Sequence, residues 1–404
     1  MALLSLDEAY RRLLARAHRT DAERVSLTDA VGRVLTDPKV TAAVDVPPFA
    51  NSAMDGFALR AAGTPGVLRV VGEVAAGARE LPTVEAGTAV RIMTGAPLPP
   101  GADAVVPIED ATEREDRLTV PDGVPSAAHV RAAAHDTRAG DEICLPGELT
   151  PAGIGVLASI GIGAVEVRRR PIVAILSTGD ELVGPGESLG PGQIHDANGV
   201  ALAAAAIEAG ATPLLLPRLP DEASPIESAL VDAARQADLV VTSGGVSVGR
   251  HDYVRAVLER RGSLDFWRIA VQPGKPLAVG ALGGATVIGL PGNPVSALVT
   301  FELFVRPFIR FMLDLDGGDG RLHVRATPTQ RMTKDHARRA FLRVSVWHED
   351  GGIHARPAGG QQSSQLRPLA DGNALLVVPE GVDAAETTQT YEAIVFGPLL
   401  LTGR

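Results

Sequence analysis

The stretch of sequence that decides the fold lies in the middle of the chain and runs Leu239-Val240-Val241-Thr242-Ser243-Gly244-Gly245-Val246-Ser247-Val248-Gly249. Its opening run, Leu239–Thr242, shows no polar alternation, which is typical of a strand buried on both faces of a parallel sheet. The glycines that follow permit positive φ and allow a ligand to approach the backbone. A helical pattern resumes at about Asp252, so free N–H groups and the positive helix end face the loop. The sequence therefore predicts a strand, a phosphate-binding loop and a helix.

Similar units lie on both sides of this stretch. Short apolar runs bounded by turn residues alternate with helical patterns, which is typical of a parallel sheet with helices on both faces. The predicted strands are Ile172–Leu176, Pro213–Leu216, Leu239–Thr242 and Thr286–Leu290, and the predicted helices are Val200–Ala209, Ile226–Ala237, Tyr253–Arg260 and Val295–Phe311. We therefore expect a central three-layer parallel α/β domain.

The remainder of the chain has a different texture and predicts further domains. Residues 45–140 are rich in Gly, Pro and Val, with strand patterns such as Val67–Val74 and Val90–Met93 between turns, which indicates a β-rich domain. The last part, from about residue 317, has short strand patterns typical of a small β barrel or sandwich. Near the N-terminus, Leu27–Leu35 follows a first helical pattern and predicts a second helical segment.

Reactive and flexible residues gather where the predicted strands end. Asp180 and Glu181 follow the first strand, Ser243–Gly249 follows the third, and Pro291–Pro294 follows the last. In an open parallel sheet, ligands bind beyond the carboxyl ends of the strands, so these loops are expected to share one edge. Carboxylates there suit Mg²⁺ binding or acid–base chemistry. Lys275 stands between two prolines that stiffen its loop. Each feature alone also fits an ordinary turn, and their coincidence favours a binding site.

Composition excludes several classes of function. The formal net charge of −10 opposes binding to nucleic acid or to an anionic membrane, and aromatic residues make up only 3% of the chain. Cys144 is the sole cysteine, which excludes an intramolecular disulfide and multi-cysteine metal sites. The sequence shows neither a signal peptide nor a membrane-spanning stretch. We expect a cytoplasmic protein that binds neither nucleic acid nor membranes.

Three other motif-based classes can be compared with the sequence. Gly245–Gly249 matches the G-x-S-x-G pattern of serine hydrolases, with Ser247 as the nucleophile. The glycine-rich loop is longer than the sharp turn of such enzymes, and the downstream histidines lie in the β-rich tail. The sequence lacks the G-x-x-x-x-G-K-[ST] motif of nucleoside triphosphatases, and its histidines lack the spacing of zinc ligands.

Five strings carry a family resemblance: Pro47–Ala58, Arg91–Ala96, Ser177–Leu182, Ser243–Tyr253 and Gly289–Ser296. In this order they resemble the molybdopterin molybdenumtransferase family, which includes bacterial MoeA and the E domain of gephyrin. The match extends over essentially the whole chain. Each string alone is of middling specificity, whereas five in register are very specific.

The resemblance implies a multidomain α/β and β protein with four parts. These are a MoaB/Mog-like α/β domain at 171–316, a β-rich second domain at 45–140, a C-terminal β barrel at 317–404 and a discontinuous N-terminal domain at 1–44 plus 141–170. Family members form homodimers whose site lies between the α/β domain of one subunit and the second domain of the other.

The family's reaction inserts molybdate into adenylylated molybdopterin and releases AMP, with Mg²⁺ offsetting the phosphate charge. The resemblance implies catalytic roles for Asp55, Thr94, Asp136, Glu181 and Asp252, with Asp252 and Asp180 near Mg²⁺. It implies substrate contacts for Asp180, Ser243, Gly244, Gly245, Ser247, Gly249, Lys275, Pro291, Gly292, Asn293, Pro294, Arg339 and Ser363. Expected protein partners are a molybdopterin adenylyltransferase and apo-molybdoenzymes.

The chain departs from the family pattern at a few positions. The family often has lysine where this chain has Arg268 and Gln272, and it usually has Gly-Glu where Ala134 and His135 precede Asp136. Two other functions stay open: a molybdopterin adenylyltransferase that consumes ATP, and a non-catalytic cofactor-binding or scaffold protein. The flanking domains argue against the first, since adenylyltransferases consist of the α/β domain alone.

Overall fold

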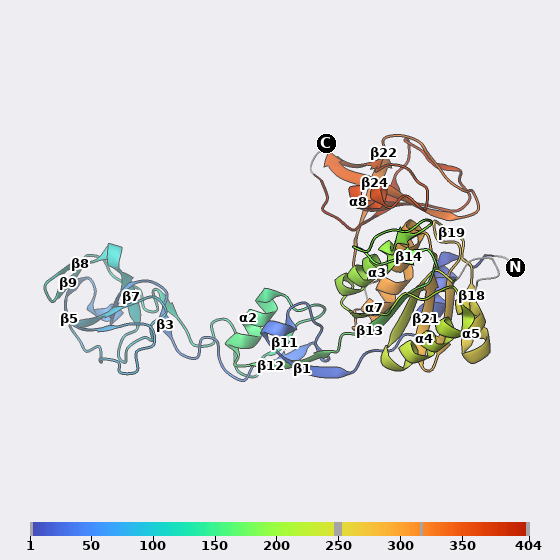
Figure 1. Ribbon diagram of the computed structural model, residues 1–404. Helices are drawn as coiled ribbons and strands as arrows, with labels where there is room; N and C mark the ends of the chain where they lie inside the picture. Colours follow the sequence, from blue (N-terminus) through green and yellow to red (C-terminus); the bar gives the residue numbers. More distant parts are fainter. Residues whose placement is uncertain (1–2, 246–252, 316–317, 401–404) are drawn as a thin grey trace. The chain divides into compact units, whose positions relative to one another are not determined.

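The computed structural model describes residues 3–245, 253–315 and 318–400 (Figure 1). The chain divides into two compact units, which are described separately. The larger unit contains residues 1–23 and 168–404, and the smaller contains residues 24–167. Within the described ranges, no helix is both long enough and apolar enough to cross a membrane.

A six-stranded sheet forms the centre of the larger unit. Its strands, in spatial order, are β16 (Thr212–Leu215), β13 (Ile172–Ser177), β17 (Leu239–Ser243), β21 (Ala285–Leu290), β20 (Ala278–Leu282) and β18 (Ser263–Trp267). The strands from β16 to β21 run parallel, whereas β20 pairs antiparallel with both β21 and β18. The predicted parallel strands are therefore confirmed, and two antiparallel strands extend one edge.

Helices cover both faces of this sheet, as predicted (Figure 1). They are α3 (Ala197–Glu208), α4 (Ala223–Gln236), α5 (Tyr253–Arg261), α6 (Pro294–Thr300) and α7 (Arg306–Met312), with a π-helical turn, η4 (Phe301–Val305), between the last two. Apolar residues of α4 and α5 pack on Ala174 and Leu176 of β13. Since successive strand residues point to opposite faces, Val173 and Ile175 face the other layer.

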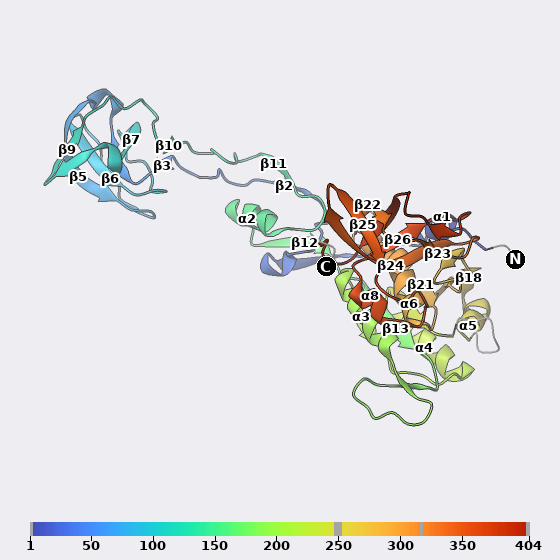
Figure 2. The ribbon, with the colours of Figure 1, turned by 90° about the horizontal axis from the view of Figure 1, so that it is seen from above.

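The C-terminal strands close into a barrel (Figure 2). The strands are β22 (Leu322–Pro328), β24 (Arg339–Glu349), β25 (Gly352–Pro357), β26 (Ala374–Val378) and β28 (Tyr391–Val395). The sheet runs β24-β25-β22-β28-β26, and a further pairing of β24 with β26 completes the ring. The short strand β19 (Val271–Gln272) extends from the α/β domain and pairs with β24. The expected C-terminal β barrel is confirmed.

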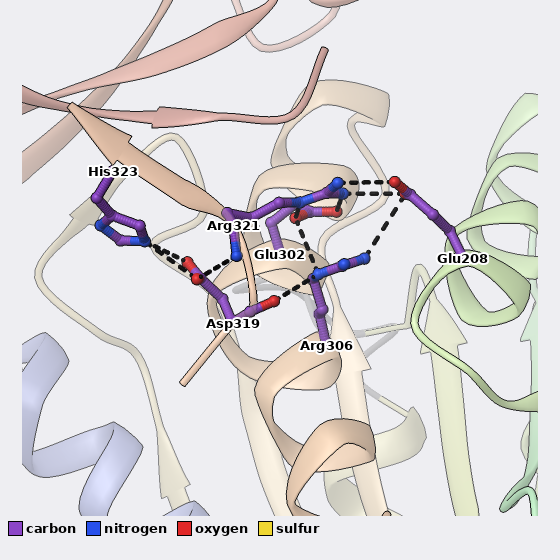
Figure 3. A network of polar contacts seen from close by, with 6 residues as sticks. All are labelled: Glu208, Glu302, Arg306, Asp319, Arg321 and His323. Atoms are coloured by element: carbon purple, nitrogen blue, oxygen red, sulfur yellow. Dashed lines mark hydrogen bonds and ion pairs between the residues drawn. The ribbon is translucent and has the colours of Figure 1, made fainter. Parts of the chain in front are cut away.

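A cluster of charged side chains links the barrel to the α/β domain (Figure 3). The guanidinium of Arg321, at the start of the barrel, donates to Glu208 of α3 at 2.7 and 2.9 Å. It also donates to Glu302 in the π-helical turn at 2.9 Å. The side chain of Arg321 is only 9% exposed, so both carboxylates serve a buried charge. This cluster therefore ties the first barrel strand to two helical segments.

The smaller unit contains a second six-stranded sheet and a small separate core. The sheet strands, in spatial order, are β7 (Ala104–Pro107), β4 (Gly56–Leu59), β6 (Thr88–Ile92), β5 (Gly66–Val74), β9 (Arg117–Val120) and β8 (Thr112–Arg114). This confirms the expected β-rich domain. The separate core joins Ala30 and Leu35 to Leu149 and Leu157 from the far end of the unit.

Short elements complete the two units. In the smaller unit they are β2 (Lys39–Thr41), β3 (Asn51–Ser52), β10 (Val130–Arg131), β11 (Glu142–Cys144), α2 (Pro151–Ser159) and β12 (Ala164–Arg168), which pairs with β1 (Ala22–Ser26). In the larger unit they are α1 (Leu6–Leu14), β14 (Leu182–Val183), β15 (Ile194–His195), β23 (Met332–Thr333), α8 (Arg367–Asp371) and β27 (Ala384–Ala385). Helix α1 thus lies outside the unit that contains residues 24–44, with which the sequence analysis grouped it.

The predicted helical segment over Leu27–Leu35 is wrong. Only Thr28–Ala30 forms a single 3₁₀ turn, and Val31 is extended with ψ at 129°. Gly32 then adopts φ of +71°, a left-handed conformation that ends any right-handed helix. The apolar spacing in this segment arises because side chains from a turn and extended backbone enter the same core as α2.

Candidate functional site

The loops after β13, β17 and β21 meet at one edge of the sheet. The strand register places Ser177 opposite Ser243, and Ser243 opposite Leu290, so the three strands end level with one another. Backbone hydrogen bonds continue beyond the strands: the N–H of Thr178 donates to Ser243 at 3.3 Å, and that of Gly244 donates to Leu290 at 3.2 Å. The convergence expected from the sequence is therefore present.

A cleft of about 620 Å³ opens between these loops. It is lined by Thr178, Glu181, Leu182, Ile194, His195, Asp196, Ala197, Asn198, Asp221, Ser243, Gly244, Gly245, Pro276, Pro291, Gly292, Asn293, Pro294 and Ser364. All three predicted loops contribute to this lining, and Glu181 supplies an exposed carboxylate. Its volume is in the range of small-molecule sites.

Backbone conformation and close packing explain why the loop after β17 contains glycines. Gly244 adopts φ of +92° and Gly245 φ of +68°, both in the left-handed region. A Cβ on Gly244 would lie 3.0 Å from the carbonyl oxygen of Thr178 and 3.1 Å from its hydroxyl. A Cβ on Gly292 would lie 3.8 Å from the Cα of Gly244, so the two loops approach closely. Glycine at 244 is thus required by both conformation and packing.

Buried hydroxyl groups surround the ends of the strands. The Oγ atoms of Ser177, Thr178 and Thr242 are buried and have no hydrogen-bond partner among the residues that the structure describes. Thr178 also lines the cleft. Buried polar groups are normally paired, so such hydroxyls suit a site that a polar ligand completes.

Asn198 is a cleft residue that the sequence analysis missed. It lies in the first turn of α3, and the helix begins after Asp196, whose carboxylate accepts a hydrogen bond from the N–H of Gly199 at 2.8 Å. The side-chain amide of Asn198 donates to the Oγ of Ser243 at 2.8 Å and to the carbonyl of Gly292 at 2.7 Å. The Asp-x-Asn sequence at a helix start was the available signal.

The two neighbouring carboxylates at the end of β13 lie in different surroundings. Glu181 lines the cleft, whereas Asp180 lines a smaller adjacent hollow with Arg218. The carboxylate of Asp180 accepts a hydrogen bond from the N–H of Asp221 at 3.1 Å. Asp221 itself lines the main cleft and was not predicted. The structure therefore separates the pair that the sequence analysis placed together.

Lys275 lies in a loop that two prolines, Pro273 and Pro276, stiffen. Its side chain is exposed, and its carbonyl accepts a hydrogen bond from Ile269 at 3.0 Å. The adjacent Pro276 lines the cleft. Gln272, where the family often has lysine, accepts a hydrogen bond from the N–H of Asp335 through its side-chain oxygen at 2.9 Å. That amide joins the loop to the barrel domain.

The barrel domain contributes to the cleft through one loop. Ser363 Oγ accepts a hydrogen bond from the side-chain amide of Asn293 at 3.0 Å, and its carbonyl accepts one from Val295 at 3.1 Å. The next residue, Ser364, lines the cleft. Arg339, in contrast, pairs with Asp7 at 2.9 Å and with Glu380 at 3.2 Å, and does not line the cleft.

In the smaller unit, Asp55 and Thr94 form a direct pair. The carboxylate of Asp55 accepts hydrogen bonds from the N–H of Thr94 at 2.6 Å and from its hydroxyl at 2.9 Å. These two hydrogen bonds lower the pKa of Asp55, because they favour the anionic form. Asp136 is exposed, and its N–H donates to the carbonyl of Val46 at 2.9 Å.

Three predicted site residues, Ser247, Gly249 and Asp252, lie outside the described residues. Within the described ranges, no group of three or more His, Cys, Asp or Glu side chains could hold a metal ion on its own. Mg²⁺ is commonly held by one or two carboxylates together with substrate phosphates.

Comparison with known families matches nearly the whole chain. Residues 4–161 match "MoeA N-terminal region (domain I and II)", residues 174–310 match "Probable molybdopterin binding domain", and residues 325–396 match "MoeA C-terminal region (domain IV)". The three regions keep the order that is found here. The central match covers all three loops of the cleft.

Individual relatives agree with this assignment. The chain is 38% identical to molybdopterin molybdenumtransferase 2 of Mycobacterium tuberculosis, over 90% of this chain and 93% of the relative. It is also 38% identical to the molybdopterin molybdenumtransferase of Haemophilus influenzae, over 95% and 97% of the two chains. The solved molybdopterin biosynthesis MoeA protein of Pyrococcus horikoshii is similar in structure, with a TM-score of 0.83, 30% identity and coverage of 98% and 100%.

Proposed function

This chain belongs to the molybdopterin molybdenumtransferase (MoeA) family, and we propose that it inserts molybdate into adenylylated molybdopterin, releasing AMP and forming the molybdenum cofactor. The observation that carries this proposal is the cleft in which the three sheet-edge loops meet. A nucleotide-like anion requires a cradle without side chains, and Gly244 and Gly245 supply one.

Different residues at the cleft have different roles in the proposed reaction. The backbone of the Ser243–Gly249 loop binds the phosphate, and Pro291–Pro294 forms the opposite wall. Lys275 offers a cation to the molybdate or the dithiolene, although its side chain is not part of the observed lining. Glu181 acts on the phosphoanhydride or orients the attacking oxygen, as a carboxylate at a phosphoryl centre commonly does.

Mg²⁺ fits the hard oxygen ligands that the chain offers at this edge. Glu181 and Asp221 bring carboxylates to the cleft, Asp180 precedes Glu181 in the sequence, and Asp252 follows the Ser243–Gly249 loop. When bound together with substrate phosphates, the ion would offset the charge that develops on the leaving phosphate.

We further propose that the enzyme is a cytoplasmic homodimer in which Asp55, Thr94 and Asp136 of one subunit serve the cleft of the other. Two observations support this proposal. The motifs resemble those of the family, and the carboxylate of Asp55, which accepts two hydrogen bonds from Thr94, is exposed. A molybdopterin adenylyltransferase would supply the substrate, and apo-molybdoenzymes would accept the product. Arg339 and Ser363 are proposed as more distant oxyanion contacts.

The decisive assay mixes the purified protein with adenylylated molybdopterin, Mg²⁺ and molybdate and measures AMP release. We expect molybdate-dependent AMP release, reduced about 100-fold or more in Glu181→Gln, as is usual when an acid–base group is removed. Glu222→Gln is the matched control, because Glu222 is an exposed carboxylate outside the cleft, and it should retain wild-type turnover.

Other outcomes identify the alternatives. Consumption of ATP and molybdopterin in place of the adenylylated substrate would show an adenylyltransferase. Unchanged turnover in Glu181→Gln, with binding intact, would remove the catalytic role of this carboxylate. Labelling of Ser247 by a fluorophosphonate probe would instead support a serine hydrolase.

A further inference from the structure

Asn198 connects two loops that belong to different strands. Ser243 ends β17, and Gly292 lies in the turn after β21, while Asn198 comes from the start of α3. The three residues are separated by 45 and 94 positions in the sequence and meet only through the fold. The amide thus occupies the point where the glycine loop and the Pro291–Pro294 turn diverge.

The chemistry of the contact fixes the orientation of the amide. The carbonyl oxygen of Gly292 can only accept a hydrogen bond, so the atom of Asn198 that lies 2.7 Å from it must be the nitrogen. The same nitrogen lies 2.8 Å from the Oγ of Ser243. Both N–H bonds are therefore used within the protein, one toward each loop, and no other residue type of this size supplies two such donors.

One backbone hydrogen bond among the described residues, from the N–H of Gly244 to the carbonyl of Leu290 at 3.2 Å, joins the two loops where their strands end. Gly244 and Gly292 have no side chains to pack against each other, and Ser243 is buried with only 3% exposure. The Oγ of Ser243 accepts the hydrogen bond from the Asn198 amide, and this bond fixes its position. A phosphate cradle works only when its N–H groups keep a fixed spacing from the opposite wall.

We infer that Asn198 is a positioning residue that sets the width of the cleft by joining the glycine loop to the Pro291–Pro294 turn. This inference rests on the proposed function, since it concerns the site at which the adenylylated substrate is held. Asn198 needs no contact with the reacting atoms for this role. Its loss should weaken binding more than it slows the chemical step.

The test compares Asn198→Asp, which has the same shape but lacks both donors, with Asn198→Ala. Hydrogen exchange of the amides at Gly244, Gly245, Gly292 and Asn293 is measured together with the affinity for AMP alone. We expect at least tenfold faster exchange at these amides and at least tenfold weaker AMP binding in both variants. The KM for the adenylylated substrate should rise by a similar factor, while kcat stays within about threefold.

Val200→Ala is the matched control, because Val200 lies on the same helix and is 49% exposed. It should leave both exchange and affinity unchanged. A double variant with Ser243→Ala should show no more exchange in the glycine loop than either single variant, since both remove one contact.

Two results would overturn the inference. One is exchange and AMP affinity within twofold of wild type in both Asn198 variants. The other is faster exchange throughout the α/β domain, which would mean that Asn198 is needed for folding as a whole. Failure of wild-type protein to release AMP would count against the proposed function only, because loop exchange is measured without turnover.

Discussion

At the scale of single residues, the Asp55–Thr94 pair gives the clearest electrostatic result. Two hydrogen bonds from one threonine keep an exposed carboxylate anionic. A carboxyl group whose pKa is lower in the folded than in the unfolded state increases the free energy of unfolding of the protein at pH values above its unfolded pKa. That gain is lost as the pH falls through the folded pKa. Any role that requires an anionic Asp55 should therefore persist below about pH 3.9, the ordinary value for aspartate.

Thr94→Val tests this relation, because valine keeps the shape and the backbone N–H but removes the hydroxyl donor. We predict that the pKa of Asp55 rises toward its ordinary value in Thr94→Val and stays low in Thr94→Ser. A titration of the carboxyl carbon by NMR measures both. An equal pKa in the valine variant and the wild type would show that the hydroxyl has no influence.

Residue-level prediction from sequence succeeded where a motif fixed the backbone and failed where the fold created the contact. The glycine loop and the Pro291–Pro294 turn were found because strand ends and turn residues mark them. Asn198 was missed, because Asp-x-Asn at a helix start usually marks only a helix cap, and the partners of Asn198 lie far along the chain. The separation of Asp180 from Glu181 likewise depends on the path of the loop after β13.

At the scale of elements, the parallel strands were predictable and the antiparallel ones were not. Buried strands such as β13 and β17 are continuous apolar runs, which a sequence displays directly. In contrast, β18 includes an exposed Asp265 and β20 includes Gly280, so neither shows a clear strand pattern. The Leu27–Leu35 segment shows the converse error, in which apolar spacing imitated a helix.

The glycine loop permits a prediction at this scale with a close control. Gly244→Ala should destabilise the protein by more than Gly186→Ala. Both glycines have φ near +90°, which costs a residue with a Cβ about 1–2 kcal/mol. Only Gly244 would also bring the new Cβ against Thr178, whereas nothing lies within 4 Å at Gly186.

Urea unfolding gives the free energy of each variant, and AMP affinity should fall only in Gly244→Ala. Equal losses of stability in the two variants, with unchanged AMP affinity, would contradict the close approach of Gly244 to Thr178. Both substitutions place a Cβ on a residue with positive φ, so the difference between the two variants reports the packing around the new Cβ.

At the scale of the whole molecule, the Arg321 cluster holds the barrel domain against the α/β domain (Figure 3). The barrel in turn supplies Ser363 and Ser364 to the cleft wall. Burial opposes the charge of Arg321, but hydrogen bonds to Glu302 and Glu208 outweigh it and raise the pKa of the guanidinium. This buried charge is one of several contacts between the barrel and the α/β domain, beside the pairing of β19 with β24 and the hydrogen bond from Asn293 to Ser363.

Arg321→Gln should lower the stability of the larger unit by about 3 kcal/mol, the lower end for breaking a buried ion pair, because Glu208 is partly solvated. Arg331→Gln, which breaks an exposed pair with Glu386 in the same domain, should cost less than about 1 kcal/mol. Urea titrations of the two variants provide the comparison. Similar losses in both would mean that the buried cluster is energetically no different from a surface pair.

The architecture of the whole chain was predictable in outline from motif order, and its finer choices were not. The sequence left open a barrel or a sandwich for the C-terminal part. The pairing of β24 with β26 shows that it is a barrel, and this pairing joins residues 30 to 38 positions apart, which no local sequence pattern relates. The placement of α1 with the larger unit is a long-range outcome of the same kind.

The central claim is that one cleft, built from three strand ends, holds the nucleotide part of the substrate. A crystal structure of the protein soaked with AMP, Mg²⁺ and molybdate tests it most directly. We predict electron density for AMP between Glu181 and Asn293, with its phosphate within hydrogen-bond distance of the N–H group of Gly245, since the N–H of Gly244 donates to Leu290. Well-defined AMP at another place on the molecule, with this cleft filled by solvent alone, would contradict the account.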